Sequence, residues 1–497
     1  MQHSDELPIC IANLTVDGSA AIPMHRQLSD ALRRAIIEET LAAKQTLPSI
    51  RDLAQATGIS RSTVLRSLED LESQGYIVMN PGSGCCVADH LPGDISDMDE
   101  PFGGAVQLSQ GNQNLRLSSY GERLLTMGSD TSVDFLKQLN HGGPALDLSP
   151  IQQWRDIFRR HCRLRDADKL ESAREPFGFP PLREAYAAYL TRARAVRCTK
   201  EQVAVFFARE LRLDLILRLW LNVGDSVAVE NPGYPGARQR FAAHGANVVP
   251  IPVDSAGMSV EHLVALPERF KFVYVTPSHQ EPTGGVMPLS RRRKLLNWAK
   301  ETGALIIEDD YDSEFRYASC PIPSLQGLED GSPVIHLSCL WKTLSPVVKI
   351  GFMVVPNQLT TMLTQAKELV ERDVPFIDQF ALTDFINEGY LERHIRKARK
   401  IYAVRRQTLV QALSQHFGKR VVMSIESAGM DLLVRLDTTA DDETLQALGK
   451  EAGLIITSSQ PYYVGKGRQG EFVIPFSLLS EDQIRQGVKK FALSLSQ

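Results

Sequence analysis

The sequence predicts a multidomain protein with a small, mainly helical N-terminal unit, a large α/β unit and a smaller α+β unit. The chain has 497 residues, which is too long for one ordinary domain. Between residues 20 and 90, three amphipathic helical patterns precede the pattern of a short β hairpin. From about residue 134 onward, helical stretches alternate with short β-rich runs. That alternation indicates a mostly parallel sheet covered by helices on both faces.

The composition is that of an ordinary globular protein, with 43% hydrophobic and 23% charged residues and a net charge of −4. The N-terminus lacks the charged-then-apolar pattern of a signal peptide. The longest apolar stretches contain charges, as Leu213–Val223 does with Asp214 and Arg218. Seven scattered cysteines show no spacing typical of a metal site. We therefore expect a reduced, cytoplasmic protein with no membrane span and no metal.

Residues 20–90 form the first expected domain, in which three helices come first. The first helix covers Pro23–Glu38 and the second covers Ser49–Thr57, where Gly58 supplies the positive φ of a helix end. Ser60 caps the third helix, which stops at Gly75. The residues expected to face inward on this third helix are Val64, Leu65, Leu68 and Leu71. Two short strands, Tyr76–Val78 and Cys85–Ala88, flank a turn-rich NPGSG tip, which completes a helix-turn-helix with a wing.

Residues 91–132 are expected to be a linker, because they are rich in Gly, Ser, Asp, Asn and Gln and have weak periodicity. Residues 133–497 form the large remaining domain. Its expected strands are Val203–Phe207, Ser226–Glu230, Val248–Val253, Phe272–Thr276, Leu305–Glu308, Val334–Leu337 and Lys349–Val355. Its expected helices include Leu182–Ala195, Leu211–Leu221, Arg291–Glu301 and Arg393–Phe417.

Asp309 and Lys342 each follow one of the expected strands, and sites in such sheets form at the carboxyl ends of strands. A lysine that can hold an aldehyde and a carboxylate that can keep a pyridine nitrogen protonated are the two groups that pyridoxal phosphate chemistry requires. The pair therefore predicts a cofactor site in the large domain.

The segment LPSIRDLAQATGISRSTVLRSLEDLESQGYI (residues 47–77) resembles the winged helix of GntR-type regulators. The resemblance implies contact with double-stranded operator DNA through the second helix, the recognition helix and the wing tip. The residues that it assigns to DNA are Ser49, Arg51, Arg61, Ser62, Thr63, Arg66, Gly82 and Gly84. Acidic side chains outnumber basic ones in residues 1–90, so one copy should bind DNA weakly and a dimer is expected.

The rest of the chain resembles the fold-type-I aminotransferase-like domain of MocR-type regulators, a subgroup of the GntR group. The runs that carry this resemblance are FGFPPLREAYAAYL, VGDSVAVENPGYPGAR, VYVTPSHQEPTGGVMPLSRRRKLLNWA, IIEDDYDSEFRY and PSLQGL. The resemblance implies a head-to-tail homodimer that senses a small-molecule effector. It also implies that Lys342 carries pyridoxal phosphate, Asp309 pairs with the pyridine nitrogen, Tyr311 contacts the ring hydroxyl and Tyr234 stacks on the ring.

The phosphate half of this site departs from the family pattern. Where the family has a Gly/Ser-Gln-Gln stretch, this chain has Ala208–Leu211, in which Arg209 could compensate in part. Cys339 and Trp341 stand where the family has a threonine and a serine before the lysine. Lys349 stands where the family has its phosphate-binding arginine. The remaining departures are Glu281, in place of the Asn of the enzymes' NPTG, and Val473, near the position of the arginine that binds the substrate carboxylate.

Three hypotheses follow from this sequence. The first is a transcriptional regulator that senses a small molecule through pyridoxal phosphate on Lys342. The second is a regulator whose large domain no longer binds the cofactor, and which serves as a dimerisation scaffold or senses another ligand. The third is a working aminotransferase with an accessory DNA-binding domain, which the missing carboxylate anchor disfavours. The colour of the purified protein discriminates the first from the second.

Overall fold

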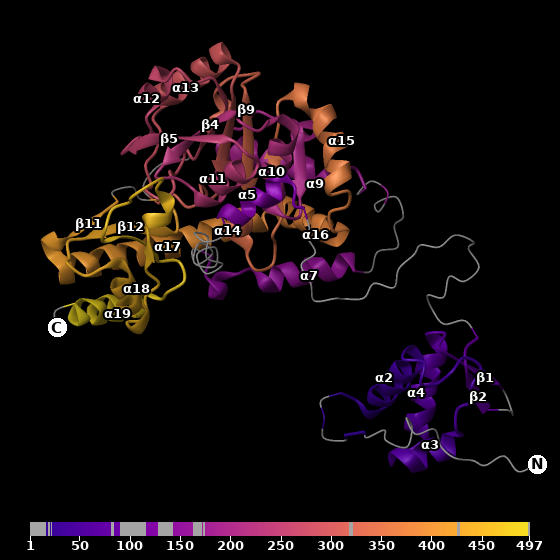
Figure 1. Ribbon diagram of the computed structural model, residues 1–497. Helices are drawn as coiled ribbons and strands as arrows, with labels where there is room; N and C mark the ends of the chain where they lie inside the picture. The colour runs from indigo at the N-terminus through magenta and orange to yellow at the C-terminus, as the bar shows by residue number, and fades with distance from the viewer. Residues whose placement is uncertain are drawn as a thin grey trace, which may run out of the picture. The chain divides into compact units, whose positions relative to one another are not determined.

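The computed structural model describes residues 16–17, 20, 22–80, 84–89, 116–127, 143–162, 171, 174–317, 322–424 and 428–495. The chain divides into two compact units, residues 1–113 and 114–497 (Figure 1). No helix in these described ranges is long and apolar enough to cross a membrane.

The described part of the first unit contains three helices and a two-stranded antiparallel sheet, as the sequence predicts. Their bounds are α2 (Met24–Ile37), α3 (Ile50–Thr57), α4 (Arg61–Ser73), β1 (Ile77–Asn80) and β2 (Gly84–Val87). Its core is formed by apolar side chains from every one of these elements. Leu28, Leu32 and Leu53 are fully buried, and Ile77 and Val87 close the core from the sheet.

The expected inward position of Leu65 is wrong. Leu65 is 37% exposed, whereas Val64, Leu68 and Leu71 are fully buried. Successive helix residues are rotated by about 100°, so positions 64, 68 and 71 share one face and position 65 lies about a quarter-turn away. An apolar residue next to a buried one therefore need not be buried.

The second unit is built on an eight-stranded sheet in the order β3-β10-β9-β8-β7-β4-β5-β6. The strands are β3 (Val203–Phe206), β4 (Ser226–Asn231), β5 (Asn247–Asp254), β6 (Gly257–Met258), β7 (Phe270–Val275), β8 (Leu305–Asp310), β9 (Val334–Cys339) and β10 (Gly351–Val354). The strands from β9 through β8, β7 and β4 to β5 are parallel. β10 is antiparallel to both β3 and β9, so the sheet is mixed.

Helices cover both faces of this sheet, because alternate residues of each strand pack into different apolar clusters. α10 (Arg209–Trp220), α11 (Pro235–Ala243) and α15 (Thr360–Val370) cover the face that carries Ile307. The opposite face is covered by α9 (Pro180–Arg194), α12 (Val260–Ala265), α13 (Leu289–Thr302) and α16 (Phe376–Asn387). The other helices of this part are α5 (Ser119–Met127), which falls in the stretch expected to be a linker, α7 (Ile151–His161) and the short α14 (Trp341–Leu344).

The smaller α+β part follows the long helix α17 (Tyr390–Phe417). Its antiparallel sheet has the order β11-β12-β14-β13, with α18 (Asp442–Glu451) and α19 (Glu481–Ser494) packed beside it. The strands are β11 (Val421–Met423), β12 (Asp431–Leu436), β13 (Thr457–Ser458) and β14 (Glu471–Pro475). α17 belongs to two cores: Leu391 and Ile395 pack with the large sheet, whereas Tyr402 and Leu409 pack with the small one.

Candidate functional site

The two helix starts of the winged helix are fixed by serine caps. The Ser49 hydroxyl accepts a hydrogen bond from the Asp52 backbone N–H at 3.2 Å, and Ser60 accepts one from the Thr63 N–H at the same distance. Gly58 between these helices has φ +69°, a conformation that favours glycine and turns the chain sharply. The start of α4 is therefore held at a defined angle to α3.

The three arginines assigned to DNA are all exposed. Within the described residues, the side chains of Arg51, Arg61 and Arg66 form neither an ion pair nor a hydrogen bond. Arg61 is the first residue of α4 and Arg66 lies a little over one turn later. Guanidinium groups that are exposed and not held in an ion pair are available for phosphates and base edges.

The remaining assigned residues divide between capping and the wing. Ser49 and Thr63 take part in the caps, and Ser62 is exposed within hydrogen-bonding distance of the cap, 2.9 Å from the Ser60 hydroxyl. Gly84 opens β2, is exposed and has φ +91°. Gly82 lies outside the described residues. A groove of about 660 Å³ brings together Ser49, Arg51, Arg61 and Gly84 on one surface of this unit.

In the second unit, most of the residues assigned to the cofactor surround one cavity of about 280 Å³. Asp309 lies inside β8 rather than after it, and Lys342 lies on α14, just after β9. Both line the cavity, as do Tyr234, Tyr311 and Arg209. Lys349 is exposed and does not line it. The structure thus brings together five of the six assigned residues.

Lys342 is 9% exposed and is surrounded by carboxylates. Its Nζ lies 3.3 Å from Asp431 Oδ2, and 5.5 Å from the centre of the Tyr311 ring. Burial by itself would lower the pKa of Lys342, but the negative charges of Asp431, Asp312 and Glu281 outweigh burial and raise the pKa. Burial, together with the neighbouring carboxylates, raises the pKa of Glu281 to about 8. This end of the cavity therefore favours a positive charge.

Asp309 lines the cavity from β8. Its Oδ2 accepts a hydrogen bond from the Tyr274 hydroxyl. Burial raises the pKa of Asp309, while the nearby Arg212 charge and the Tyr274 hydrogen bond act in the opposite direction. A cationic partner at this carboxylate would favour its ionised form, which is the state that a protonated pyridine nitrogen requires.

Tyr311 is held in place beside the cavity. Its hydroxyl lies 3.0 Å from His279 Nδ1, and the same nitrogen lies 2.9 Å from Asp312 Oδ1. Burial raises the pKa of Tyr311 well above its usual value, so the hydroxyl keeps its proton. The Asp312 carboxylate accepts from His279 Nδ1–H, which leaves the Tyr311 hydroxyl proton free to be donated toward the cavity.

The third wall of the cavity is rich in arginine. Arg209 is the first residue of α10, and its guanidinium stacks 4.8 Å from the centre of the Trp341 ring. Its Nε also lies 2.7 Å from Glu210 Oε1. The buried Arg212 donates to the Phe352 carbonyl at 2.9 Å, and Arg240 of α11 lines the same wall. Arg209 and Arg212 lie in the first turn of α10, and Arg240 adds a third guanidinium group from the last turn of α11, so this wall attracts an anion.

Sequence reasoning missed several residues of the site. Arg212, Arg240, Tyr274 and Asp431 all contribute to the cavity or to the charge on Lys342. Arg212 could have been found, because it lies one helical turn after Arg209 and so shares its face. The other three come from α11, β7 and β12, and no pattern within one segment connects them.

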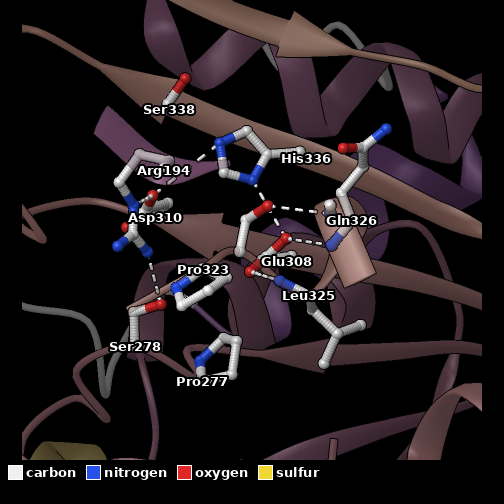
Figure 2. A network of polar contacts seen from close by, with 12 residues as sticks. Arg194, Pro277, Ser278, Glu308, Asp310, Pro323, Leu325, Gln326, His336 and Ser338 are labelled. Carbon is white, nitrogen blue, oxygen red and sulfur yellow. Dashed lines mark hydrogen bonds and ion pairs between the residues drawn. The ribbon is translucent and has the colours of Figure 1, made fainter. Parts of the chain in front are cut away.

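A buried charge network lies behind Asp309, on the other face of β8 (Figure 2). Glu308 Oε2 is 3.1 Å from His336 Nδ1, and Glu308 also accepts the backbone N–H groups of Leu325 and Gln326 at 2.7 and 3.1 Å. Asp310 accepts a hydrogen bond from Arg194 Nε at 2.7 Å. Because strand residues alternate between faces, this network fixes β8 without entering the cavity.

Together, these features define a class of protein: a winged-helix DNA reader joined to an aminotransferase-like unit. Residues 24–87 match the bacterial regulatory proteins of the gntR family, and residues 138–491 match aminotransferase class I and II. The α-aminoadipate aminotransferase LysN from Thermus thermophilus is structurally similar, with a TM-score of 0.68, 26% identity, and coverage of 76% of this chain and 97% of that one.

The relatives narrow this class. The probable rhizopine catabolism regulatory protein MocR of Rhizobium meliloti is 33% identical over 476 residues, which cover 96% of this chain and 94% of that protein. The pyridoxine biosynthesis transcriptional regulator PdxR of Corynebacterium glutamicum is 28% identical, covering 92% of this chain and 93% of that protein. The chain belongs to the MocR-type subgroup of GntR regulators, and it is a DNA-binding transcriptional regulator.

Proposed function

We propose that the aminotransferase-like unit binds pyridoxal phosphate and an amino compound, and that this binding controls recognition of an operator. The observation that carries the proposal is one cavity lined by Lys342, Asp309 and the arginines of its third wall. The solved structure of LysN contains N-(5'-phosphopyridoxyl)-L-leucine, a phosphorylated pyridine with an attached amino acid.

The residues present fit this cofactor. An anionic phosphate suits the N-terminus of α10, where Arg209 and Arg212 supply positive charge. Asp309 would hold a proton at the pyridine nitrogen, and Tyr311 would donate to the ring hydroxyl. Tyr234 lines the same cavity and offers an aromatic face. When bound, the cofactor supplies an aldehyde that reacts with amines, and Lys342 would hold it covalently.

The carboxylates around Lys342 would determine where the amino group of the amino compound binds. The amino group of an incoming ligand would compete with Lys342 Nζ, which lies 3.3 Å from Asp431. Asp431 would orient a ligand ammonium near the position that Lys342 occupies, and the Glu281 carboxyl oxygen would accept a hydrogen bond from it. Arg51, Arg61 and Arg66 would bind DNA, with the second winged helix supplied by a head-to-tail dimer. Ligand binding acts by stabilising one arrangement of the dimer over another.

A second candidate function is regulation without the cofactor, with the large unit as a dimerisation scaffold or a receptor for another ligand. The ion pair between Lys342 and Asp431 favours it, because a charged lysine does not react with an aldehyde. Trp341 and Cys339 also replace hydroxyl groups that would bind phosphate, and Glu210 adds a negative charge to that wall.

The visible absorption spectrum of the purified protein separates these two functions. With pyridoxal phosphate added, the first predicts a visible band that borohydride bleaches and that Lys342→Ala abolishes. Lys400→Ala, an exposed lysine on α17, is the matched control and should keep the band. A protein that stays colourless with excess pyridoxal phosphate contradicts cofactor binding and leaves the second function.

A further inference from the structure

A second cavity, of about 260 Å³, lies apart from the cofactor cavity and shares no lining residue with it. It is enclosed by α9, by α17 and by the segment that follows β8. Its lining residues are Tyr189, Ala193, Arg194, Ser313, Glu314, Arg316, Glu392, Ile395, Arg396 and Arg399. Nothing in the cofactor chemistry uses this cavity.

One face of α17 forms a continuous wall of the cavity. Glu392, Ile395, Arg396 and Arg399 follow each other at helical spacing, so their side chains lie on one side of the helix. Arg399 is held firmly, because its Nε and Nη2 donate to the Glu314 carbonyl at 3.0 and 2.7 Å. Arg396 is exposed, and within the described residues its side chain has neither an ion pair nor a hydrogen bond. One guanidinium is thus positioned in advance and another remains available.

The balance of charge in the cavity is positive. Arg194 is compensated by Asp310, and Glu392 is compensated by Arg192 at 2.9 Å. Glu314 is the remaining acid in the lining, and its Oε1 accepts a hydrogen bond from Tyr189 at 3.3 Å. Tyr189, Ala193 and Ile395 supply apolar surface beside the arginines.

We propose that this cavity is a second ligand site, which takes a small organic anion that carries a carboxylate on an apolar body. Arg396 and Arg399 would bind the carboxylate, since guanidinium groups pair with carboxylates through charge-assisted hydrogen bonds. The side chains of Tyr189 and Ile395 would cover the apolar body.

The place of the site suggests what binding would affect. Ser313 and Glu314 follow Asp309 and Tyr311 in one short segment, so the two cavities share that segment as a wall. Arg194 connects the second cavity to Asp310 and to the network behind β8 (Figure 2). α17 also joins the cores of the large and small sheets. A ligand at this position contacts elements that move together if the small part shifts against the large one.

The proposal is tested with benzoate as the probe, on the full-length chain, by ligand-observed NMR and calorimetry. Benzoate is expected to bind, and benzylamine, which has a similar shape and the opposite charge, is not. Arg396→Ala should weaken benzoate binding about tenfold, as expected for one charge-assisted hydrogen bond. Lys397→Ala removes an exposed cation from the neighbouring position of the same helix and should leave binding unchanged.

A third variant covers the case in which benzoate binds elsewhere, for example at the arginines of the cofactor cavity. Burial raises the pKa of Glu314 to about 7, so Glu314→Gln removes a negative charge from the lining at pH 8 and should strengthen benzoate binding there by a few-fold. The proposal is overturned if benzoate shows no binding at tens of millimolar. It is equally overturned if the affinity is the same in the wild type, Arg396→Ala and Glu314→Gln, or if benzylamine binds as tightly as benzoate.

Discussion

Replacing Arg209 by alanine tests the assignment of the phosphate wall directly. The sequence alone points to Lys349 as the residue in the place of the family's phosphate-binding arginine, whereas the structure puts Arg209 on the cavity wall and leaves Lys349 exposed. The two assignments therefore predict opposite effects of these substitutions on the affinity for pyridoxal phosphate. Arg209→Ala should weaken binding strongly, and Lys349→Ala should change it less than about twofold.

The magnitude follows from the surroundings of Arg209. A charged hydrogen bond to phosphate is worth roughly 1.5–3 kcal/mol. Arg209 must first leave Glu210, and this pair of partly exposed groups is worth about 0–1 kcal/mol. Its stacking on Trp341 exists before and after binding, so it cancels. The net loss is about 0.5–3 kcal/mol, and its midpoint corresponds to a dissociation constant roughly twentyfold larger.

The assay is a titration of the protein with pyridoxal phosphate, followed by visible absorbance. Arg218→Ala is the control on the same helix, because Arg218 is 56% exposed and paired with Asp214 away from the cavity. Unfolding temperatures of all variants should agree within a few degrees before affinities are compared. The reasoning is refuted if Arg209→Ala binds like the wild type while Lys349→Ala loses affinity.

Three further predictions concern DNA binding and stability. Arg61→Ala should lower operator affinity by about tenfold or more, because one guanidinium contact is worth about 1–3 kcal/mol. Fluorescence anisotropy at fixed salt measures this affinity, and Arg34→Ala on α2 is the control, which should have a smaller effect. Leu65→Ala should change the free energy of unfolding in urea by less than about 0.5 kcal/mol, and Leu68→Ala should lower it by about 2–5 kcal/mol. Burial raises the pKa of Glu230 from 4.5 to about 7, so ionising it costs stability as the pH rises between these values. Thermal unfolding from pH 5 to 8 should therefore show Glu230→Gln gaining stability relative to the wild type, and a constant difference would contradict this.

The winged helix was predictable because its signals are local. Ser49, Gly58 and Ser60 each act within a few residues, and the structure has a cap or a helix end at each of them. The sheet of the large unit was predictable in its strands but not in the direction of β10. Strand direction depends on which neighbours a strand meets, and β10 pairs with β3 and β9, which are far apart in sequence.

The site was predictable where one segment carries it. Asp309 and Tyr311 lie in one run, and the family pattern joins them to Lys342. The carboxylate beside Lys342 was not predictable, since Asp431 is 89 residues further along the chain and comes from the small sheet. The arginines of the third wall were predictable only in part, because Arg240 belongs to another helix.

The charges around β8 explain how Asp309 is kept in the cavity although the phosphate half of the site departs from the family pattern. Three consecutive acids occupy Glu308, Asp309 and Asp310, which would repel each other strongly in a buried strand without compensation. The outer two are compensated on one face by His336 and Arg194 (Figure 2). The charges of these partners help to hold the pKa values of both acids low. Asp309 alone faces the cavity with a raised pKa, and the compensating charge there must come from Arg212 and from a ligand. A cationic ring that binds beside Asp309 would supply this compensating charge. We therefore expect Asp309→Asn to lower the affinity for a pyridinium ligand and to leave the network behind β8 unchanged.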